Sequence, residues 1–140
     1  MGKLYIKWEE VVEYVKETGD RVHAHYASDI EARGIFTFYK GGATLAAMLS
    51  YYLEEKYGWD VPMLLSPANG CIIIDDILDT GITMKKYSDL KGSRKYFLTT
   101  MFIKDFQLEG TAQFQCTLDY YKCIKVDEWI VFPWEMDEEK

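Results

Sequence analysis

Two adjacent carboxylates and a short polar turn follow a strongly apolar run near the middle of the chain. The run is Cys71–Ile74, the acids are Asp75 and Asp76, and the turn spans Asp79–Thr83. Because the run ends in three consecutive β-branched residues, we expect a strand buried on both faces, as in a parallel sheet. Residues 84–90 have the pattern of a helix. The turn would then lie at the carboxyl end of a strand, where α/β proteins bind ligands.

The turn has the chemistry of a phosphate site. Its backbone N–H groups would open a helix and form an anion-binding nest, to which threonine hydroxyls add donors. A glycine lets the backbone approach a phosphate closely. The residues of this nest are Thr80, Gly81, Ile82 and Thr83. Asp79 stands between the nest and the two acids, where it could act on a group that leaves or attacks a sugar.

Asp75 and Asp76 have a different chemistry, since carboxylates do not bind phosphate. They suit sugar hydroxyls, or a Mg²⁺ ion held through water. A site with a phosphate end and a diol or metal end fits a phosphorylated ribose. The alternative is a buried strand that ends in an ordinary acidic turn, as in a receiver-type domain. That alternative does not require the Asp-Thr-Gly-x-Thr sequence of residues 79–83.

Residues 72–83 resemble the phosphoribosyl pyrophosphate (PRPP) signature of the type I phosphoribosyltransferases: an apolar run, two acids, two apolar residues and Asp-Thr-Gly-x-Thr. The resemblance implies an α/β fold with a Rossmann-like, mostly parallel sheet flanked by helices. It also implies that residues 79–83 bind the 5′-phosphate of PRPP. Asp75 and Asp76 would contact the ribose hydroxyls and a metal, and Asp79 would take a proton from the base as general base.

Residues 40–42 resemble the pyrophosphate-binding loop of the 6-oxopurine branch of this family, in particular of the xanthine-guanine enzymes. The resemblance implies that Lys40 and Gly41 bind pyrophosphate. The family's bond before the first glycine is often cis, and a cis Lys40–Gly41 bond would cost about 3–4 kcal/mol. A plain helix-entry turn is the alternative for these residues.

Three more matches to this branch concern the base and a second metal ion. Lys104 follows a predicted strand, where the family places a lysine that donates to the purine 6-oxo group. Trp129 and Ile130 resemble the base-binding end, where an aromatic ring stacks on the purine and the adjacent backbone recognises its edge. Glu135 replaces the usual aspartate that helps to bind a second Mg²⁺. The alternatives are a surface lysine for Lys104 and core packing for Trp129.

The chain departs from the family at the flexible hairpin that usually precedes the signature strand and closes over the reaction centre. Here only residues 66–70 join the two predicted strands. Closing loops exclude water and complete the site in many enzymes. The shortened loop therefore implies cover by another segment or subunit, or a protein that binds without turnover. We also expect a reduced hood, with the irregular residues 105–117 as its altered form.

The rest of the chain alternates strand and helix patterns, which favours one α/β domain over residues 1–140. Strands are expected at residues 3–7, 35–39, 61–65, 96–103 and 118–124, and helices at 8–16 and 43–56. Gly19 is expected to end the first helix. Residues 22–26 alternate like an edge strand, which would place His23 and His25 on one face. Without a third ligand nearby, we expect them to be surface residues and not a metal site.

Composition limits the partners and the cellular setting. A net charge of −7 argues against general nucleic-acid binding and leaves an anionic substrate to local dipoles, Mg²⁺ and a few cations. No apolar run approaches the ~20 residues that cross a membrane, and no signal peptide is apparent. Cys71, Cys116 and Cys123 form no CxxC motif and are expected to be thiols in a reducing compartment. The cytoplasm is the expected location.

Together these features predict a Mg²⁺-dependent enzyme that joins a 6-oxopurine base (xanthine, guanine or hypoxanthine) to C1′ of PRPP. The alternative is a non-catalytic regulator that binds PRPP or a nucleotide, and a pyrimidine- or nucleoside-specific transferase is a third option. We expect no nucleic-acid or membrane partner. A homo-oligomer, either dimer or tetramer, is expected, and Tyr51 and Tyr52 would mark a dimer face or pack inside.

Overall fold

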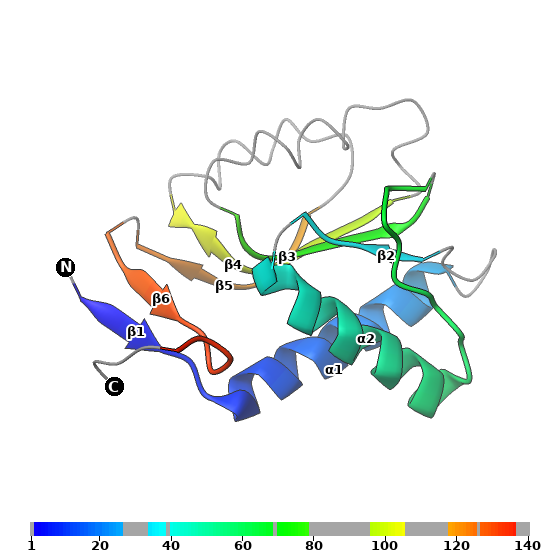
Figure 1. Cartoon of the computed structure of the whole chain (residues 1–140), viewed down its shortest axis with the longest axis horizontal. Helices are drawn as coiled ribbons and strands as arrows, with labels where there is room; N and C mark the ends of the chain where they lie inside the picture. Colours follow the sequence, from blue (N-terminus) through cyan, green and yellow to red (C-terminus); the bar gives the residue numbers. More distant parts are fainter. Residues whose placement is uncertain are drawn as a thin grey trace.

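The computed structural model describes residues 2–26, 34–38, 40–68, 70–78, 96–105, 118–125 and 127–136. Within these residues, a four-stranded sheet carries two helices on one face (Figure 1). The strands, in order across the sheet, are β2 (Ile35–Phe36), β3 (Ile72–Leu78), β4 (Phe97–Lys104) and β5 (Leu118–Ile124). All the pairings in this sheet are parallel, which confirms the predicted mostly parallel sheet.

A second, two-stranded sheet brings the two ends of the chain together. Strand β1 (Lys3–Tyr5) pairs in parallel with β6 (Trp129–Val131), and Leu4 lies opposite Ile130. Both strands lie beyond the helix layer at the end of the molecule that carries the N-terminus (Figure 1). The sequence pattern predicted a strand at the first of these positions, two residues longer than the one observed.

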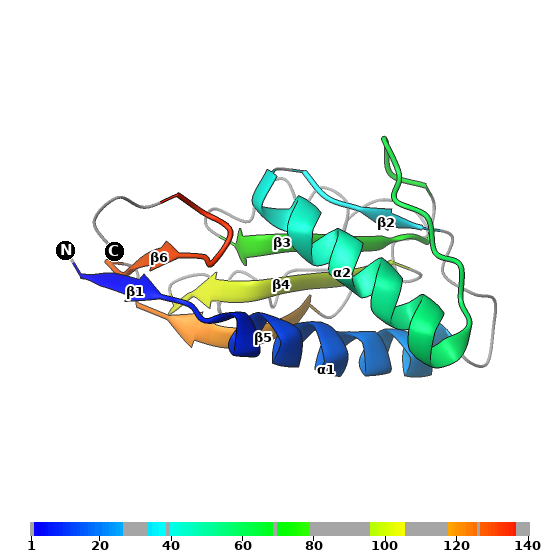
Figure 2. The ribbon, with the colours of Figure 1, turned by 60° about the horizontal axis from the view of Figure 1, so that its bottom comes forward.

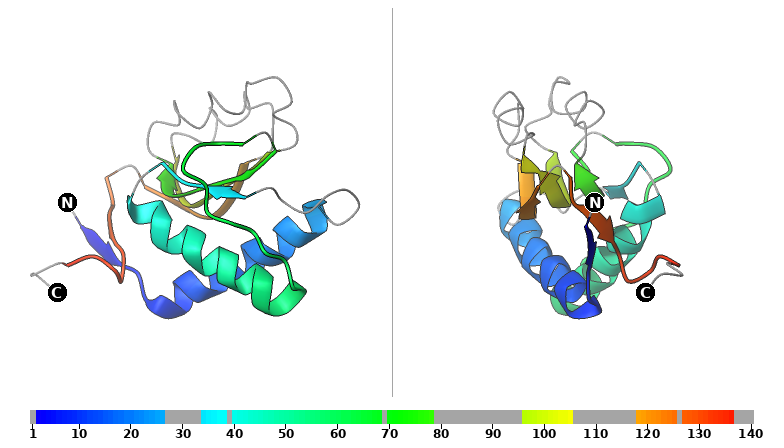
Figure 3. Two further views of the ribbon diagram at one scale, coloured as in Figure 1. Left: turned by 45° about the vertical axis from the view of Figure 1, so that its right-hand side comes forward. Right: turned by 90° about the vertical axis from the view of Figure 1, so that its left-hand side faces the viewer.

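The helices α1 (Trp8–Tyr26) and α2 (Lys40–Tyr57) cover the same face of the sheet, as Figures 2 and 3 show. Ile72 and Ile74 of β3 belong to the buried cluster beneath these helices, whereas Ile73 belongs to a second cluster. All three isoleucines are fully buried. Neighbouring strand residues point to opposite faces, so β3 is buried on both faces, as its run of apolar residues predicted.

Helix α1 is longer than predicted. Gly19 does not end it, and residues 22–26 form its last turns and not an edge strand. The buried residues Val11, Val15, Val22 and Tyr26 keep helical spacing through the glycine. A side chain at Gly19 would overlap the ring of Tyr52 on α2. The glycine therefore allows the two helices to approach closely. In the sequence, a glycine with this packing role looks the same as a glycine that ends a helix.

Because residues 22–26 are helical and do not form a strand, the two histidines lie on different faces. Residues two apart on a helix point about 200° away from each other, so His23 and His25 do not share a face. The ring of His23 stacks on Tyr57, with centroids 3.7 Å apart, and His25 lies against Phe97. Among the described residues, no group of three His, Cys, Asp or Glu side chains could hold a metal ion.

The strand predicted at residues 61–65 is absent. Only Met63 makes an isolated parallel bridge, to Ile35 of β2. The backbone around it is tied to β2 by two further hydrogen bonds, Ile35 N to Pro62 O and Leu64 N to Ile35 O. In the part of the chain that the structure describes, no helix has the length and apolar character needed to cross a bilayer.

Gly19 gives a direct test of the close packing between α1 and α2. In an isolated helix, Gly19→Ala would stabilise the helical state by about 1 kcal/mol. Because the new methyl group would overlap the Tyr52 ring, we expect the opposite sign, a loss of about 1–3 kcal/mol in the free energy of unfolding. Urea denaturation measures it. Gly2→Ala, where no atom lies within 4 Å of the new Cβ, is the control. A stabilised Gly19→Ala variant would show that the helices are not packed this closely.

Asp20 lies beside this contact and joins the two helices through its carboxylate. Its Oδ1 atom accepts hydrogen bonds from the hydroxyls of Tyr57 (2.6 Å) and Tyr52 (2.7 Å) and from Lys56 Nζ (2.9 Å). These donors favour the charged form, so the bonds from Tyr57, Lys56 and Tyr52 lower the pKa of Asp20 to about 2. The cluster fixes the ring of Tyr52 against α1.

The lowered pKa of Asp20 predicts the pH dependence of its contribution. The native carboxylate holds its proton less tightly than the unfolded one, so the stabilisation is complete above about pH 4 and is lost toward pH 2. Because the site is exposed, we expect Asp20→Asn to lower the free energy of unfolding by about 0.5–1 kcal/mol at pH 7. This difference from wild type should shrink as the pH falls below 4. Urea midpoints over this range, with Asp60→Asn as control, measure it; a difference that does not change with pH contradicts the assignment.

Candidate active site

The sequence predicted Asp75 and Asp76 at the end of the apolar run; in the structure they lie inside β3, because the strand continues to Leu78. The ladder to β4 is interrupted at Asp76. Asp75 pairs with Thr100 and Ile77 pairs with Phe102, but Asp76 has no partner in this register. Ile77 packs on the same cluster as Ile74, although residues three apart in a regular strand face opposite sides. The pairing of β3 with β4 is therefore irregular at Asp76, although the register is the same on both sides of it.

The two carboxylates accept hydrogen bonds from backbone N–H groups at this point of the strand. Asp75 Oδ1 accepts a hydrogen bond from the N–H of Asp76, and Asp76 Oδ1 accepts one from the N–H of Ile77, both at 2.8 Å. Each acid thus fixes the backbone of the residue that follows it. Its second carboxylate oxygen takes no part in this bond to the backbone. Such bonds between adjacent residues explain how two neighbouring acids are tolerated in a largely buried strand.

Asp75 is the more deeply buried acid, with 8% of its surface exposed. Burial, followed by the hydrogen bond and the charge of Asp76, raises the pKa of Asp75 to about 8. Burial beside a second acid therefore disfavours the charged form of the Asp75 carboxyl group. A divalent cation or a cluster of donors at this point would favour the charged form.

The first turn of α2 lies directly against these acids. Residues 40–42 begin the helix, so they form a helix-entry turn and not the separate loop that the family resemblance implied. The Lys40–Gly41 bond is trans, because the described residues contain no cis peptide bond. A side chain at Gly41 would overlap the carboxylate of Asp76, and one at Gly42 would overlap the Thr37 hydroxyl. The two glycines thus let the helix N-terminus reach β3, where its N–H groups favour an anion.

Lys104 occupies the predicted place at the end of β4. Leu78, the last residue of β3, pairs with Ile103, so the two strands end at the same edge of the sheet. Lys104 Nζ donates a hydrogen bond of 2.6 Å to the carbonyl oxygen of Glu128. Since Glu128 directly precedes Trp129, the structure brings together the lysine and the aromatic residue that the resemblance assigned to the base.

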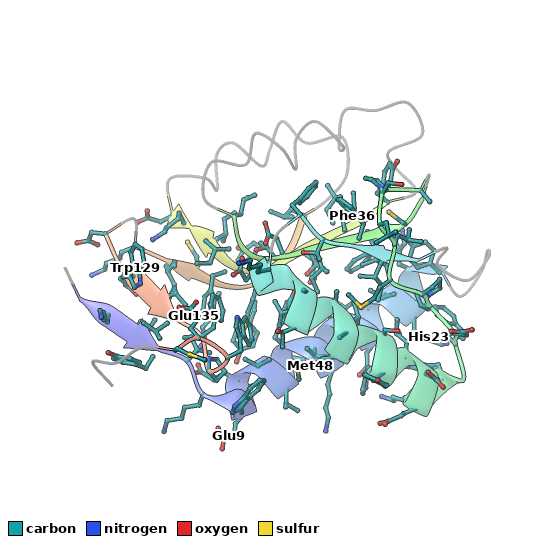
Figure 4. The ribbon with its side chains drawn as sticks, in the orientation of Figure 1. Glu9, His23, Phe36, Met48, Trp129 and Glu135 are labelled. Carbon is teal, nitrogen blue, oxygen red and sulfur yellow. The ribbon has the colours of Figure 1, made fainter. Side chains whose placement is uncertain are left out.

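Trp129 and Ile130 have the orientations that stacking on a base and backbone recognition of its edge require. The side chain of Trp129 is 57% exposed, so its ring is accessible for stacking (Figure 4). The side chain of Ile130 is buried, which leaves only its backbone for recognition. Trp129 N donates to Gly2 O, and Ile6 N donates to Val131 O. Because successive strand residues direct their polar groups to opposite sides, the N–H and C=O of Ile130 point away from β1.

Glu135 follows β6 in an exposed turn closed by its own N–H, which donates to Phe132 O. The ring of Trp134 stacks on Phe132 at 4.6 Å and packs against the core, as expected of a structural residue. The structure does not gather Glu135 with Asp75 and Asp76 into a metal-binding group. Its predicted role at a second Mg²⁺ therefore stays a prediction.

Some predicted residues lie outside the described part of the chain. They are Asp79, Thr80, Gly81, Ile82 and Thr83 of the signature turn, the helix at 84–90, Cys116, and residues 106–117 of the altered hood. Their roles stay predictions. Two residues that join the site were not singled out in the sequence. Thr37 touches Gly42, and its hydroxyl in an otherwise apolar run was the available signal. Glu128 acts through its carbonyl, which no sequence pattern reveals.

The donor set of Asp75 and Asp76 fits a Mg²⁺ ion. Mg²⁺ prefers carboxylate oxygens and usually keeps several waters or ligand phosphates in its shell, so two adjacent acids suffice on the protein side. Each acid has a second oxygen beyond the one that accepts the backbone N–H. Because the pKa of Asp75 is raised, a proton would compete with the ion for this carboxylate.

No protein-family model and no curated protein matches this sequence. Solved structures do match. A purine phosphoribosyltransferase from Pyrococcus horikoshii Ot3 has a TM-score of 0.62 at 18% identity, covering 98% of this chain and 96% of that one. The Helicobacter pylori xanthine-guanine-hypoxanthine phosphoribosyltransferase has a TM-score of 0.63 at 17% identity, covering 98% and 95%. The chain has the phosphoribosyltransferase fold. A hypothetical protein from Neisseria gonorrhoeae with bound ppGpp also matches, with a TM-score of 0.60 at 12% identity, covering 98% and 91%.

The phosphoribosyltransferase fold accounts for the arrangement of the candidate site. In α/β sheets, ligands bind beyond the carboxyl ends of the strands. Here the end of β3, the end of β4 and the N-terminus of α2 meet at that edge, with Glu128 and Trp129 beside Lys104. At 12–18% identity the matches establish the fold alone, so the roles of individual residues depend on this geometry.

Proposed function

We propose that the protein transfers the phosphoribosyl group of PRPP to a 6-oxopurine base, such as xanthine, guanine or hypoxanthine. The products are the purine mononucleotide and pyrophosphate. The observation that carries this proposal is the contact of Gly41 with the Asp76 carboxylate. This contact joins the start of α2 to the acids of the PRPP signature, although the two motifs are far apart in sequence.

Each part of the site would bind one part of the substrates. The turn 79–83 would bind the 5′-phosphate, and Asp75 and Asp76 would contact the ribose hydroxyls. Lys40 and the N–H groups at the start of α2 would bind pyrophosphate. Lys104 would leave the Glu128 carbonyl, or share its protons with it, to donate to the 6-oxo group of the purine. The exposed ring of Trp129 would stack on the base, and the Ile130 backbone would bind its edge.

The chemistry breaks the bond between C1′ and pyrophosphate and forms a bond between C1′ and a purine nitrogen. A ribosyl cation develops as pyrophosphate departs, so positioning and charge stabilisation supply most of the rate enhancement. When bound at Asp75 and Asp76, Mg²⁺ would neutralise charge on the departing group. Asp79 would accept the proton that the purine nitrogen loses. The N–H groups at the start of α2 would hold the pyrophosphate oxygens.

The solved structures support this reaction class. Two of the matched proteins are named as purine or xanthine-guanine-hypoxanthine phosphoribosyltransferases, and this chain covers almost the whole of each. The exposed Trp129 ring beside a strand-end lysine favours a purine over a smaller base, because a bicyclic base offers more stacking area. The cellular location and the closing loop stay predictions from the sequence.

The test is to incubate the protein with Mg²⁺, PRPP and one nucleobase at a time, and to measure pyrophosphate release and nucleotide formation. The panel consists of xanthine, guanine, hypoxanthine, adenine, uracil and orotate. We expect stoichiometric pyrophosphate and nucleotide with at least one 6-oxopurine and none with the pyrimidines. Turnover with a pyrimidine alone would overturn the choice of base. No release with any base, despite PRPP binding, would overturn the enzymatic assignment.

A second candidate function is a non-catalytic nucleotide-binding regulator, and the matched Neisseria gonorrhoeae protein with bound ppGpp favours it. A guanine nucleotide with pyrophosphate groups would use the same Trp129 stacking surface and the same N–H groups at the start of α2. Calorimetric titration with ppGpp, PRPP and GMP, each with Mg²⁺, separates the two functions when combined with the base panel. Tight ppGpp binding without any transferase activity supports the regulator, whereas ppGpp that competes with PRPP in an active enzyme supports an inhibited transferase.

A further inference from the structure

The peptide group between Glu128 and Trp129 is held from two sides. Its carbonyl oxygen accepts the hydrogen bond of 2.6 Å from Lys104 Nζ, and its N–H donates one of 3.1 Å to the carbonyl oxygen of Gly2. The C=O and N–H of a trans peptide point in opposite directions, so this group stands between the end of β4 and the residue before β1. The lysine and the tryptophan proposed to bind the base are therefore joined to the N-terminal strand through one peptide group.

The carbonyl of Trp129 is also held by β1. Leu4 lies opposite Ile130 in parallel register, which places the N–H of Leu4 against the C=O of Trp129. Both polar groups of the Trp129 backbone thus face β1. The side chain of Trp129 is 57% exposed, so packing around the ring contributes little to its placement (Figure 4). Because a side chain leaves a strand perpendicular to the sheet, the β1 ladder sets the direction of this ring.

Alternate residues of the N-terminal strand make these bonds. Gly2 and Leu4 direct their backbone polar groups toward β6, whereas Lys3 and Tyr5 direct theirs away from it. The ladder is short, with three residues in each strand, and a two-stranded pair has little stability of its own. The loss of a single backbone bond in this ladder should therefore change the placement of Trp129.

The groups proposed to bind PRPP lie on other elements. Asp75 and Asp76 belong to β3 in the four-stranded sheet, and Gly41 belongs to the first turn of α2. Strand β1 pairs with β6 in the separate two-stranded sheet, at the end of the molecule that carries the N-terminus (Figure 1). A change confined to the β1–β6 ladder should therefore affect binding of the base and leave binding of PRPP unchanged.

We propose that β1 positions the base site. The backbone of Gly2 and Leu4 fixes Trp129 for stacking, and the peptide group between Glu128 and Trp129 extends this constraint to Lys104. Gly2 and Leu4 are positioning residues, because they act through Trp129 and do not touch the base. This inference rests on the proposed function, since it requires the base to bind at Trp129 and Lys104. It makes affinity for the base depend on backbone groups at the opposite end of the sequence from β6.

Proline and alanine substitutions at two neighbouring positions test this inference. Leu4→Pro removes the N–H that faces the Trp129 carbonyl, whereas Lys3→Pro removes an N–H that is directed away from β6. Leu4→Ala and Lys3→Ala remove the same side chains and keep the N–H groups. Proline is tolerated at the first residue of a strand, so Lys3→Pro is the matched control. The comparison of proline with alanine at each position separates the backbone bond from the side chain.

Calorimetric titration in the presence of Mg²⁺ measures two affinities for each variant. One is for PRPP, which carries no base, and the other is for the mononucleotides of guanine, hypoxanthine and xanthine. We expect Leu4→Pro to bind the mononucleotides about tenfold more weakly than Leu4→Ala, because stacking of a base on one aromatic ring contributes about fivefold to a hundredfold in affinity. PRPP affinity should stay within about twofold of wild type. Lys3→Pro and Lys3→Ala should bind the mononucleotides equally well.

Three results would overturn this inference. They are undiminished mononucleotide affinity in Leu4→Pro, an equal loss in Lys3→Pro, and a Leu4→Pro chain that loses PRPP affinity to the same extent or unfolds by circular dichroism. The last result would show that β1 supports the whole fold and not the base site. Failure of the proposed function is seen separately, in a wild-type chain that forms no mononucleotide from PRPP and any base. The titrations would then still decide whether β1 positions a bound nucleotide.

Discussion

Replacing Asp79 by asparagine is expected to leave PRPP binding within about threefold of wild type while lowering turnover by about 10²–10⁴-fold, the contribution typical of a general base. The amide keeps the size and hydrogen-bonding groups of the side chain but cannot accept the proton that the purine nitrogen loses. Calorimetry with Mg²⁺ and PRPP measures the first quantity, and nucleotide formation at saturating substrates measures the second.

The control for this variant is Asp60→Asn, which makes the same chemical change on an exposed residue outside the proposed site. It should retain both binding and turnover. An Asp79→Asn enzyme as active as wild type would remove the proposed role of Asp79. If PRPP binding disappeared together with turnover, Asp79 would be assigned to substrate binding and not to proton transfer.

The second large effect is expected for Gly41→Ala. A Cβ atom at this position would overlap the carboxylate of Asp76, so either the start of α2 or the acid has to move. Both are proposed to bind PRPP, and we expect its affinity to fall by about tenfold or more, since displacements near 1 Å in a site typically cost about a hundredfold in rate. Calorimetric titration with Mg²⁺ and PRPP measures the affinity.

Thermal unfolding separates this effect from a loss of structure. Alanine favours the helical conformation more than glycine by about 1 kcal/mol, which partly offsets the steric strain, so the Gly41→Ala chain should remain folded. Gly2→Ala changes no contact within 4 Å and should bind PRPP as wild type does. Undiminished PRPP affinity in Gly41→Ala would show that the contact between α2 and Asp76 does not form the pyrophosphate site.

The sequence predicted the parallel sheet through local patterns that tertiary context does not change. The run Cys71–Ile74 has no polar residues at alternate positions, as a strand with one solvent-exposed face would have. It was therefore expected to be buried on both faces, as observed. The strand at Leu118–Ile124 was also predicted with its observed bounds. The strand that carries Lys104 was predicted at residues 96–103 and is observed one residue later, at Phe97–Lys104, so Lys104 lies at a strand end as expected. Each depends only on the period of apolar residues and on the polar residues that interrupt it.

Predictions failed where one residue type has two uses. Gly19 was expected to end a helix, but it lets α1 approach Tyr52, and the helix continues to Tyr26. The paired glycines at 41 and 42 were expected in a loop, yet they lie in the first turn of α2 against Asp76 and Thr37. Glycine lacks a side chain in both cases, and only the neighbouring element decides whether this serves a turn or a close contact.

The sequence by itself determined which groups are present and their order: two acids after a buried run, a turn that resembles a phosphate-binding signature, a lysine after the next strand, and a tryptophan near the end. The tertiary structure decided which of them meet. It placed Gly41 on Asp76, and Lys104 on the carbonyl that precedes Trp129. The physical reason is that parallel strands bring their carboxyl ends to one edge, whatever the length of chain between them. Contacts across that edge depend on packing distances, which periodicity along the chain does not record.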